Sequence, residues 1–222
     1  MRGTVTRDDA HKQFVVWDTL YGKRLPGDKH ARIVDIGCGN GELVHWLRER
    51  GYANAIGVDA NKELLEEGKV LGVDGLIAQD IFLFLKGKRD AFDCIIVRDV
   101  IEHFTKDELL LLLDLVYEAL RPGGIIILQT PNAEGPFGSR YRYQDFTHEL
   151  GFTRTSLYHV LRTAGFSEVL IYPLQPVVHG VKSFVRFVLW KCIEGSLRLY
   201  HLVEIGSGEG IFTQNIIAVG KK

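Results

Sequence analysis

Short apolar runs alternate with longer amphipathic stretches along residues 30–131, which is typical of β-α-β units that build a parallel sheet. The apolar runs are rich in Val and Ile, and turn-forming Gly, Asp or Pro stands near their ends. They predict strands over residues 31–37, 54–60, 75–81, 92–99 and 124–131. The stretches between them predict helices over residues 42–50, 61–71 and 106–120.

The periodic pattern breaks off after Pro131. It resumes with a helix predicted over residues 155–164 and a strand predicted over residues 167–173. The interruption, residues 132–154, is longer than most loops that only connect two elements. We therefore expect these residues to form part of a binding or catalytic site.

The composition is that of one folded domain, because 46% of the 222 residues are hydrophobic, enough for a sizeable core. We expect residues 1–222 to form a single domain, with its core in residues 30–131. Lys and Arg number 27 and Asp and Glu number 28, which leaves a formal charge of -1. Since no basic excess attracts a phosphate backbone, no nucleic-acid partner is expected.

The cysteines and the apolar tracts indicate the compartment. Cys38, Cys94 and Cys192 lie far apart in the sequence, without the spacing of a zinc site or a disulfide framework, which fits a reducing compartment. The charged start of the chain argues against an apolar leader. The longest apolar tract, residues 184–193, is interrupted by two cations and is too short to span a membrane. The expected location is cytoplasmic.

A glycine-rich loop joins the first predicted strand to the first predicted helix. Gly37, Gly39 and Gly41 follow a G-x-G-x-G spacing, and Asp35 comes directly before them in the strand. Such a loop lets a ligand approach the backbone N–H groups at the start of a helix. A dinucleotide-binding loop has G-x-G-x-x-G instead, so the spacing argues against an NAD-dependent oxidoreductase, which stays a remote alternative.

Acidic residues stand at the ends of the first three predicted strands. Asp59 is placed to accept both hydroxyls of a ribose, Asp80 the exocyclic amine of an adenine, and Asp35 a ligand ammonium. Together they suit a ligand with a sugar, an amine and no phosphates, because a pyrophosphate would be repelled. Taken singly, each residue is better explained as a helix cap or turn former. Together with the glycine loop, in order and one per strand, they favour ligand binding instead.

These residues resemble class I S-adenosylmethionine-dependent methyltransferases. The resemblance covers VDIGCGNGE, GVDA, AQD, FDCIIVRDVIEHF and LRPGGIIILQTP, which together span most of residues 33–131. It implies an α/β fold, a Rossmann-like three-layer sandwich around a seven-stranded, mostly parallel sheet. The last strand, residues 211–219, is then antiparallel to its neighbours.

The resemblance also implies the cofactor, S-adenosyl-L-methionine, and the part of the chain that holds it. Arg98 is expected to line the methionine end of the cofactor site, and His103 to lie beside the cofactor and shape the site. The full set of expected cofactor-contacting residues is Asp35, Gly37, Cys38, Gly39, Asp59, Ala60, Asp80, Ile81, Arg98 and His103.

The acceptor chemistry is predicted from the segment after the fifth strand. A sulfonium methyl donor is reactive, so the protein mainly aligns the acceptor, but an alcohol acceptor gains about 10²- to 10⁴-fold from a positioned base. We expect His148 to be that base and Asp145, three residues before it, to orient its imidazole. The alternative is that His148 caps a helix near Thr153 or bonds a backbone carbonyl.

A metal site is not expected from the sequence. Asp99, Asp145 and His148 are able to converge in such a fold, but nothing in their spacing predicts an ion.

The acceptor segment also contains aromatic residues interleaved with arginines, which suits a sugar ring with a charged group. Ordinary core filling is the expected role of Phe146 and Phe152. The runs PNAEG, RYQDFTHELGFT and SLYHVLRTAGF resemble methyltransferases that modify polysaccharides or lipid-linked glycans. This subgroup resemblance implies a sugar hydroxyl as acceptor.

Residues 173–210 form an insertion before the last strand, with a helix predicted over residues 181–200. Lys182, Arg186 and Lys191 share one side of this helix, and aromatic residues cover much of the rest. The pattern suits peripheral contact with an anionic membrane. It suits better an amphipathic helix that caps the acceptor pocket or joins a homodimer.

The predicted function is therefore O-methylation of a sugar or another small hydroxyl acceptor with S-adenosylmethionine. Two alternatives stay open. One is N- or C-methylation of a small metabolite, which needs little or no base. The other is a catalytically inactive, cofactor-binding regulatory subunit.

Overall fold

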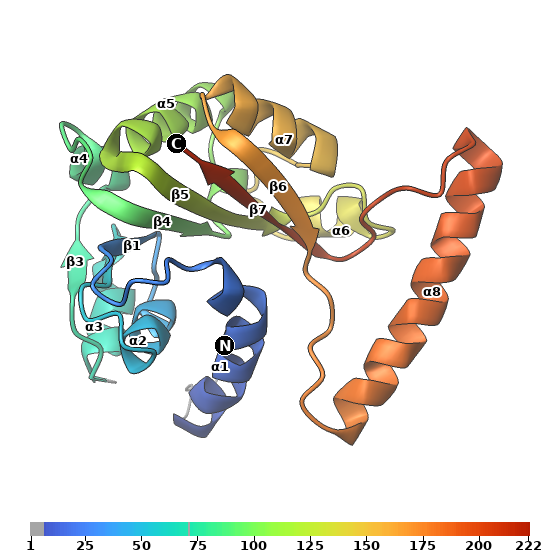
Figure 1. Ribbon diagram of the computed structural model, residues 1–222, viewed down its shortest axis with the longest axis horizontal. Coiled ribbons are helices and arrows are strands. Elements are labelled where there is room, and N and C mark those ends of the chain that lie inside the picture. The colour runs from blue at the N-terminus through green and yellow to red at the C-terminus, as the bar shows by residue number, and fades with distance from the viewer. Residues whose placement is uncertain (1–6, 71) are drawn as a thin grey trace.

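A seven-stranded sheet forms the middle layer of the protein, with helices on both of its faces (Figure 1). The computed structural model describes residues 7–70 and 72–222. The strands are β1 (Ile33–Ile36), β2 (Ile56–Asp59), β3 (Leu76–Ala78), β4 (Phe92–Arg98), β5 (Leu120–Pro131), β6 (Ser167–Pro173) and β7 (Asn215–Lys221). Their order is β3-β2-β1-β4-β5-β7-β6, and only β7 is antiparallel to its neighbours. The predicted three-layer fold with an antiparallel last strand is confirmed.

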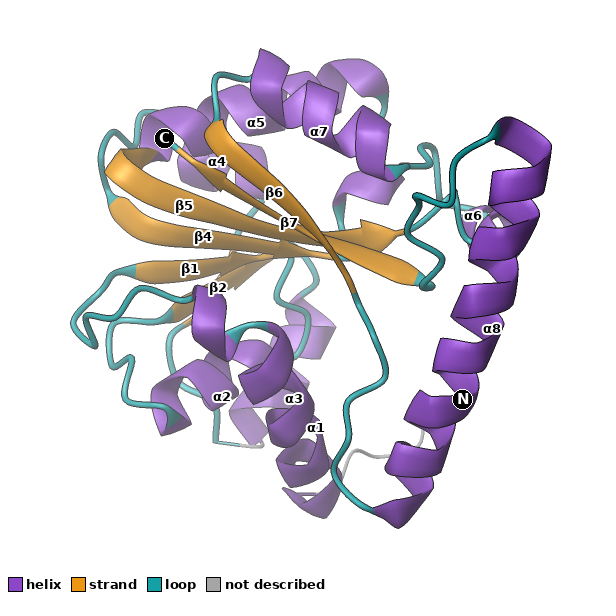
Figure 2. Ribbon diagram, turned by 45° about the vertical axis from the view of Figure 1, so that its right-hand side comes forward, coloured by secondary structure: helices purple, strands orange, loops and turns teal. Residues whose placement is uncertain are grey.

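The helices lie on the two faces of this sheet (Figure 2). They are α1 (Arg7–Leu20), α2 (Glu42–Glu49), α3 (Lys62–Val70), α4 (Ile81–Leu85), α5 (Lys106–Ala119), α6 (Gly138–Tyr143), α7 (Arg154–Thr163) and α8 (Val181–Ile205), with short 3-10 helices η1 (Gly22–Arg24) and η2 (Ile101–His103). Alternate strand residues point to opposite faces. Ile33 and Ile96 pack with α1 and α2, whereas Val34 and Ile95 pack with α4, α5 and α7.

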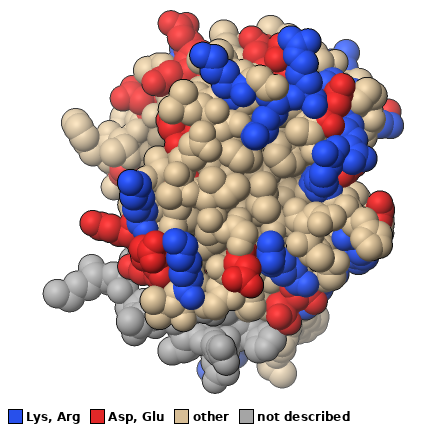
Figure 3. Space-filling view, turned by 90° about the vertical axis from the view of Figure 1, so that its left-hand side faces the viewer, with Lys and Arg blue, Asp and Glu red and all other residues tan. Residues whose placement is uncertain are grey.

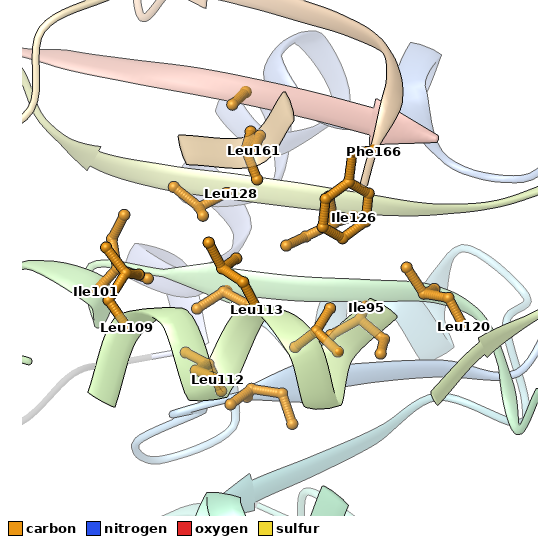
Figure 4. Packing of buried hydrophobic residues seen from close by; sticks show 14 of the residues in the cluster. Ile95, Ile101, Leu109, Leu112, Leu113, Leu120, Ile126, Leu128, Leu161 and Phe166 are labelled. Carbon is orange, nitrogen blue, oxygen red and sulfur yellow. The ribbon is translucent and has the colours of Figure 1, made fainter. Parts of the chain in front are cut away.

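Helix α5 covers the centre of one face, where its leucines meet the side chains of the sheet (Figure 4). A capping box starts the helix, because the Thr105 hydroxyl accepts from the Glu108 backbone and the Glu108 carboxylate accepts from that of Thr105. Its buried residues recur at helical spacing, and burying each Leu or Val side chain contributes about 1.5–3 kcal/mol. They are Leu109, Leu112, Leu113, Val116 and Ala119.

Three helices depart from the sequence expectations. Helix α1 was not predicted because charges of both signs mask its apolar face, although Phe14, Trp17 and Tyr21 are buried. Helix α4 begins at Ile81, where the strand was expected to end, and α6 lies inside the expected loop. Leu71, the expected last residue of the second helix, lies outside the described residues.

Helix α8 stands beside the sandwich rather than on one of its faces (Figures 1 and 2). Only Ser183 and Glu194 of this helix are buried, and many of its apolar side chains are exposed. Lys191 and Arg198 both pair with Glu194, at 2.8 and 2.9 Å. Lys191, one of the three cations of the expected basic side, is thus engaged in an ion pair, while the shared basic side stays a prediction. Among the described residues, no helix is long and apolar enough to cross a membrane.

The face of the molecule turned away from α8 carries charges of both signs around an uncharged centre (Figure 3). Lys and Arg side chains alternate there with Asp and Glu rather than gathering into one patch. This mixture agrees with a formal charge of -1 for the whole sequence.

Candidate active site

The glycine loop turns sharply at the carboxyl end of β1 and leads into α2. Its three glycines have φ between 56° and 78°, the left-handed region that favours glycine. Gly37 also packs closely against Val100, because a Cβ at position 37 would collide with Cγ2 of Val100. The loop therefore lies directly against the turn that follows β4.

Asp59 holds the glycine loop from the end of β2. Its Oδ2 accepts a hydrogen bond from the Gly39 N–H at 2.8 Å, and its Oδ1 accepts from the Asn61 N–H at 2.8 Å. Each carboxylate oxygen has a second lone pair, so the side chain is still able to accept ribose hydroxyls. Asp59 thus has a structural role in addition to its expected cofactor contact.

Asp80 is the N-cap of α4, where its Oδ1 accepts from the Leu83 N–H at 2.9 Å. The helix-cap role weighed for this residue is thus present, and the adenine contact stays a prediction. Of the other expected cofactor residues, Cys38 and Ile81 are buried and Ala60 is exposed at the edge of the loop.

Asp35 is the most unusual carboxyl group of the site. It is 1% exposed, and neither of its oxygens has a hydrogen-bond partner in the described residues. Burial raises the pKa of Asp35 to about 7, against the opposing effect of the Arg98 guanidinium. Because an unpaired buried carboxylate is costly, the position favours a ligand that brings a positive charge.

This carboxyl group gives the protein a pH-dependent stability. The unfolded chain loses the Asp35 proton near the usual value of 3.8, whereas the folded chain keeps it up to about pH 7. Stability without ligand therefore falls as the pH rises through this window. We expect the free energy of unfolding of the wild type to fall by about 3 kcal/mol between pH 5 and pH 8 because of this group. Asp35→Asn should remove this fall, as measured by urea unfolding at the two pH values.

The control for this measurement is Asp114→Asn, on the exposed side of α5. It should leave the difference between the two pH values unchanged. Equal pH dependence in the Asp35→Asn variant and the wild type would contradict the buried-carboxyl assignment.

A chain of hydrogen bonds links α1 to the end of β4. The buried Tyr21 hydroxyl donates to Oε1 of Gln129 at 2.5 Å, and Nε2 of Gln129 donates to both oxygens of Asp99 at 2.9–3.0 Å. Nδ2 of Asn215, at the start of β7, lies 3.4 Å from Oδ1 of Asp99. Asp99 is thereby fixed between the cofactor half and the acceptor half of the sheet.

His148 is brought into the site, but not by the residue that was expected to orient it. Its Nδ1 lies 3.0 Å from the backbone oxygen of Tyr141. A carbonyl oxygen only accepts, so Nδ1 carries the proton and Nε2 keeps a free lone pair. The expected contact between Asp145 and the His148 imidazole is corrected, and the backbone-carbonyl alternative is what the structure shows.

Asp145 instead orients His103 through Thr147. The Thr147 hydroxyl donates to Oδ1 of Asp145 at 2.7 Å, and Nδ1 of His103 lies 2.8 Å from the same hydroxyl oxygen. These bonds from Thr147 hold the pKa of Asp145 below its usual value, so the carboxylate only accepts. The single hydroxyl proton of Thr147 is committed to Asp145, so Nδ1 of His103 donates and its Nε2 is free.

The two imidazoles face each other beside a buried carboxyl group. The His103 and His148 rings are 4.7 Å apart at 71°, and Glu102 is 2% exposed. Ligand atoms of Glu102, His103 and His148 all lie within 4.8 Å of one another. These groups are able to hold a metal ion, and the set shares only His148 with the residues considered in the sequence, because Glu102 and His103 take the places of Asp99 and Asp145.

The acceptor loop is tied down by one arginine. The Arg142 guanidinium donates to the backbone oxygens of His148 and Glu149. Phe152 is buried as expected, whereas Phe146 is fully exposed, so the expectation of core filling is wrong for Phe146. Phe146 follows Asp145 at the surface.

A cavity of about 700 Å³ opens between α8 and the carboxyl edge of the sheet. Its wall includes Arg186 and Trp190 of α8, Phe137 and Tyr141 of the acceptor loop, and Asn215 of β7. The cavity reaches the site at two points, since Asn215 contacts Asp99 and Tyr141 holds His148.

The strand order, the glycine loop after β1 and the acidic residues after β2 and β3 define a class I S-adenosylmethionine-dependent methyltransferase. Residues 10–170 match the family model described as a methyltransferase domain, so the chain belongs to that family. The predictions of this enzyme class and of S-adenosylmethionine as its cofactor are confirmed.

One relative of known name is similar to this chain over about two thirds of its length. The chain is 30% identical over 156 residues to trans-aconitate 2-methyltransferase of Deinococcus radiodurans, covering 66% of this chain and 58% of that protein. The chain thus spans less than two thirds of that relative's length. The glycan-modifying subgroup stays a prediction.

Solved structures share the whole fold. A methyltransferase from Archaeoglobus fulgidus superposes with a TM-score of 0.71 at 24% identity, covering 95% of this chain and 94% of that chain. Phosphoethanolamine N-methyltransferase 2 of Haemonchus contortus, in complex with S-adenosyl-L-methionine, gives a TM-score of 0.65 at 15% identity, covering 100% of this chain and 58% of that chain.

Several supporting residues were missed by the sequence reasoning. Gly68 inside α3 lets this helix touch the glycine loop, because a Cβ there would collide with the Asn40 backbone oxygen. An isolated glycine within a helical pattern was the available signal. Tyr21, Gln129 and Thr147 gave no comparable signal, since their roles depend on contacts across the fold.

Proposed function

We propose that the protein transfers the methyl group of S-adenosylmethionine to a hydroxyl group of a sugar or another small acceptor. The observation that carries this proposal is the pair of imidazoles, each with a free Nε2, beside the glycine loop. Val100, which contacts Gly37, belongs to the same turn as His103. We therefore infer that the reacting oxygen of the acceptor lies between the donor and the imidazoles.

The donor is proposed to lie over the glycine loop. Asp59 accepts hydrogen bonds from the ribose hydroxyls, and Asp80 faces the adenine. The ammonium group of the donor lies near Asp35, where its positive charge offsets the cost of burying this carboxylate. Cys38, Ala60 and Ile81 complete the walls of this site. Arg98 lies on the methionine side, where its charge acts on Asp35.

The acceptor hydroxyl is proposed to lose its proton to Nε2 of His148 as its oxygen attacks the methyl carbon. The bond between methyl carbon and sulfur breaks, and the electron pair stays on sulfur, which becomes a neutral thioether. The Tyr141 carbonyl supports this step because it stabilises the imidazolium through Nδ1. The body of the acceptor occupies the cavity under α8.

A second candidate is methylation of a carboxylate. It is favoured by the similarity to trans-aconitate 2-methyltransferase, whose named substrate is a polycarboxylate. It is also favoured by Arg186 in the cavity wall, because a guanidinium group binds carboxylates well. A carboxylate is already ionised and needs no base, so the two candidates differ in their dependence on His148.

The test is methyl transfer from labelled S-adenosylmethionine to four acceptor pools: sugar nucleotides, extracted glycolipids, small polycarboxylates and ethanolamine-type amines.

Label in an alkali-stable ether on a sugar or lipid glycan is the expected result. Label in an alkali-labile ester would establish the second candidate instead. Label only in an amine would contradict both, and a chain without S-adenosylmethionine binding would exclude the reaction altogether.

Cytoplasmic location, peripheral membrane contact through residues 181–200 and a homodimer all stay predictions. The exposed apolar side chains of α8 are compatible with either of the last two.

A further inference from the structure

We propose that Glu102, His103 and His148 form a binding site for a divalent transition-metal ion, of which Zn²⁺ is the best fit. Their ligand atoms come from two separate segments, η2 and the acceptor loop, and lie within 4.8 Å of one another. Two imidazoles and one carboxylate are a known ligand set for catalytic zinc, with positions left open for water or substrate.

The distances are close to what an ion requires. Bonds of about 2.0–2.2 Å place two ligand atoms of a tetrahedral ion roughly 3.3–3.6 Å apart. The ligand atoms of the three side chains lie within 4.8 Å of one another, so side-chain rotations that shorten these distances by at most roughly 1.5 Å bring them to an ion. Glu102 has an oxygen for this purpose, because only its Oε2 accepts the hydrogen bond from the Thr130 hydroxyl.

The hydrogen bonds behind the histidines are the second observation. Histidines that bind metals donate their other ring N–H to a carbonyl, a carboxylate or water, which fixes the tautomer and the ring direction. His148 donates Nδ1–H to the Tyr141 carbonyl, and His103 donates to Thr147, which in turn donates to Asp145. Both rings thus present Nε2 lone pairs with supports of the kind that metal ligands have.

The chemistry of the donors selects the ion. Two imidazole nitrogens suit Zn²⁺, Fe²⁺, Ni²⁺ or Cu²⁺, whereas Mg²⁺ and Ca²⁺ prefer oxygen ligands. A bound ion would take up the lone pair of His148, and it would then supply the Lewis acidity that lowers the pKa of an acceptor hydroxyl, in place of proton transfer to the free imidazole. The hydroxyl proton would leave to solvent. This catalytic consequence rests on the proposed function, but ion binding itself does not.

The experiment measures binding rather than activity. The untagged full-length chain is stripped with a chelator, and its binding of Zn²⁺ is titrated calorimetrically, with Mg²⁺ as a competitor. We expect one Zn²⁺ ion per chain, not displaced by Mg²⁺ at equal concentration. His103→Ala, His148→Ala and Glu102→Gln should each weaken binding at least about tenfold, and Glu102→Gln keeps an acceptor for Thr130.

Control variants separate this site from adventitious binding. His30→Ala and Cys192→Ser, both at exposed positions, should bind Zn²⁺ as the wild type does. Thr147→Val keeps the shape of the side chain but removes the bond to His103, and it should weaken binding by about 10- to 100-fold. Thermal unfolding without metal confirms that each variant is folded.

Two results would overturn the site: no Zn²⁺ binding by the folded wild type, or equal binding by the wild type and all three ligand variants. These outcomes are distinct from failure of the proposed function. Methyl transfer by a chelated chain that binds no ion would support the proposed function and contradict the metal site. Binding of Zn²⁺ without binding of S-adenosylmethionine would support the metal site and contradict the proposed function.

Discussion

Asp59→Ala is expected to weaken S-adenosylmethionine binding by about 100-fold or more. The substitution removes the acceptor proposed for the ribose hydroxyls, the bond that holds the glycine loop at the Gly39 N–H group, and the bond to the Asn61 N–H group in the turn after β2. Hydrogen bonds to a charged group contribute about 1.5–3 kcal/mol each, so losing the ligand contacts alone accounts for this effect. Calorimetric titration with S-adenosylmethionine or its demethylated product measures it.

Asp74→Ala is the matched control, because Asp74 is an exposed aspartate just before β3. It should bind the cofactor as tightly as the wild type does. Asp59→Asn tests the charge separately, since it keeps one acceptor oxygen and should fall between the two. Wild-type affinity in Asp59→Ala would remove this residue from the cofactor site.

His148→Ala is expected to lower turnover on a hydroxyl acceptor by about 10²- to 10⁴-fold. The imidazole lies on the acceptor loop rather than in the cofactor half, so affinity for S-adenosylmethionine should change little. The measurement compares kcat with cofactor affinity for the same preparation. Added imidazole should restore part of the turnover, because a small molecule is able to enter the space left by the side chain.

His159→Ala, at an exposed position of α7, is the control for loss of an unrelated histidine. It should show full turnover. If His148→Ala also retained full turnover, the acceptor oxygen would not depend on this imidazole, as expected for a carboxylate acceptor.

The cofactor half of the site was largely predictable because its signals are local. The glycine loop, Asp59 and Asp80 follow their strands directly, so the positions of their backbones follow from the strand assignment. The structural roles of Asp59 and Asp80 were only partly predictable from the sequence. Asp80 is the N-cap of α4, and Asp59 binds the loop itself, which the sequence does not distinguish from binding a ligand.

The acceptor half was less predictable because its contacts depend on side-chain conformations between distant segments. Asp145 and His148 are close in sequence, but Asp145 bonds Thr147 and thereby supports His103, 44 residues away from Thr147. The Tyr141 carbonyl, which holds His148, has no sequence signal because every residue has a carbonyl. Glu102 was overlooked since its burial only follows from the packing of η2 under the loop.

The position of β4 in the sheet has an evolutionary consequence. Residues proposed for the donor come before or from this strand, and the cavity for the acceptor is built almost entirely from segments after it. The two halves meet mainly at the turn carrying Asp99 and His103. Replacement of the later segments by recombination therefore changes which molecules are modified while the donor machinery is inherited intact.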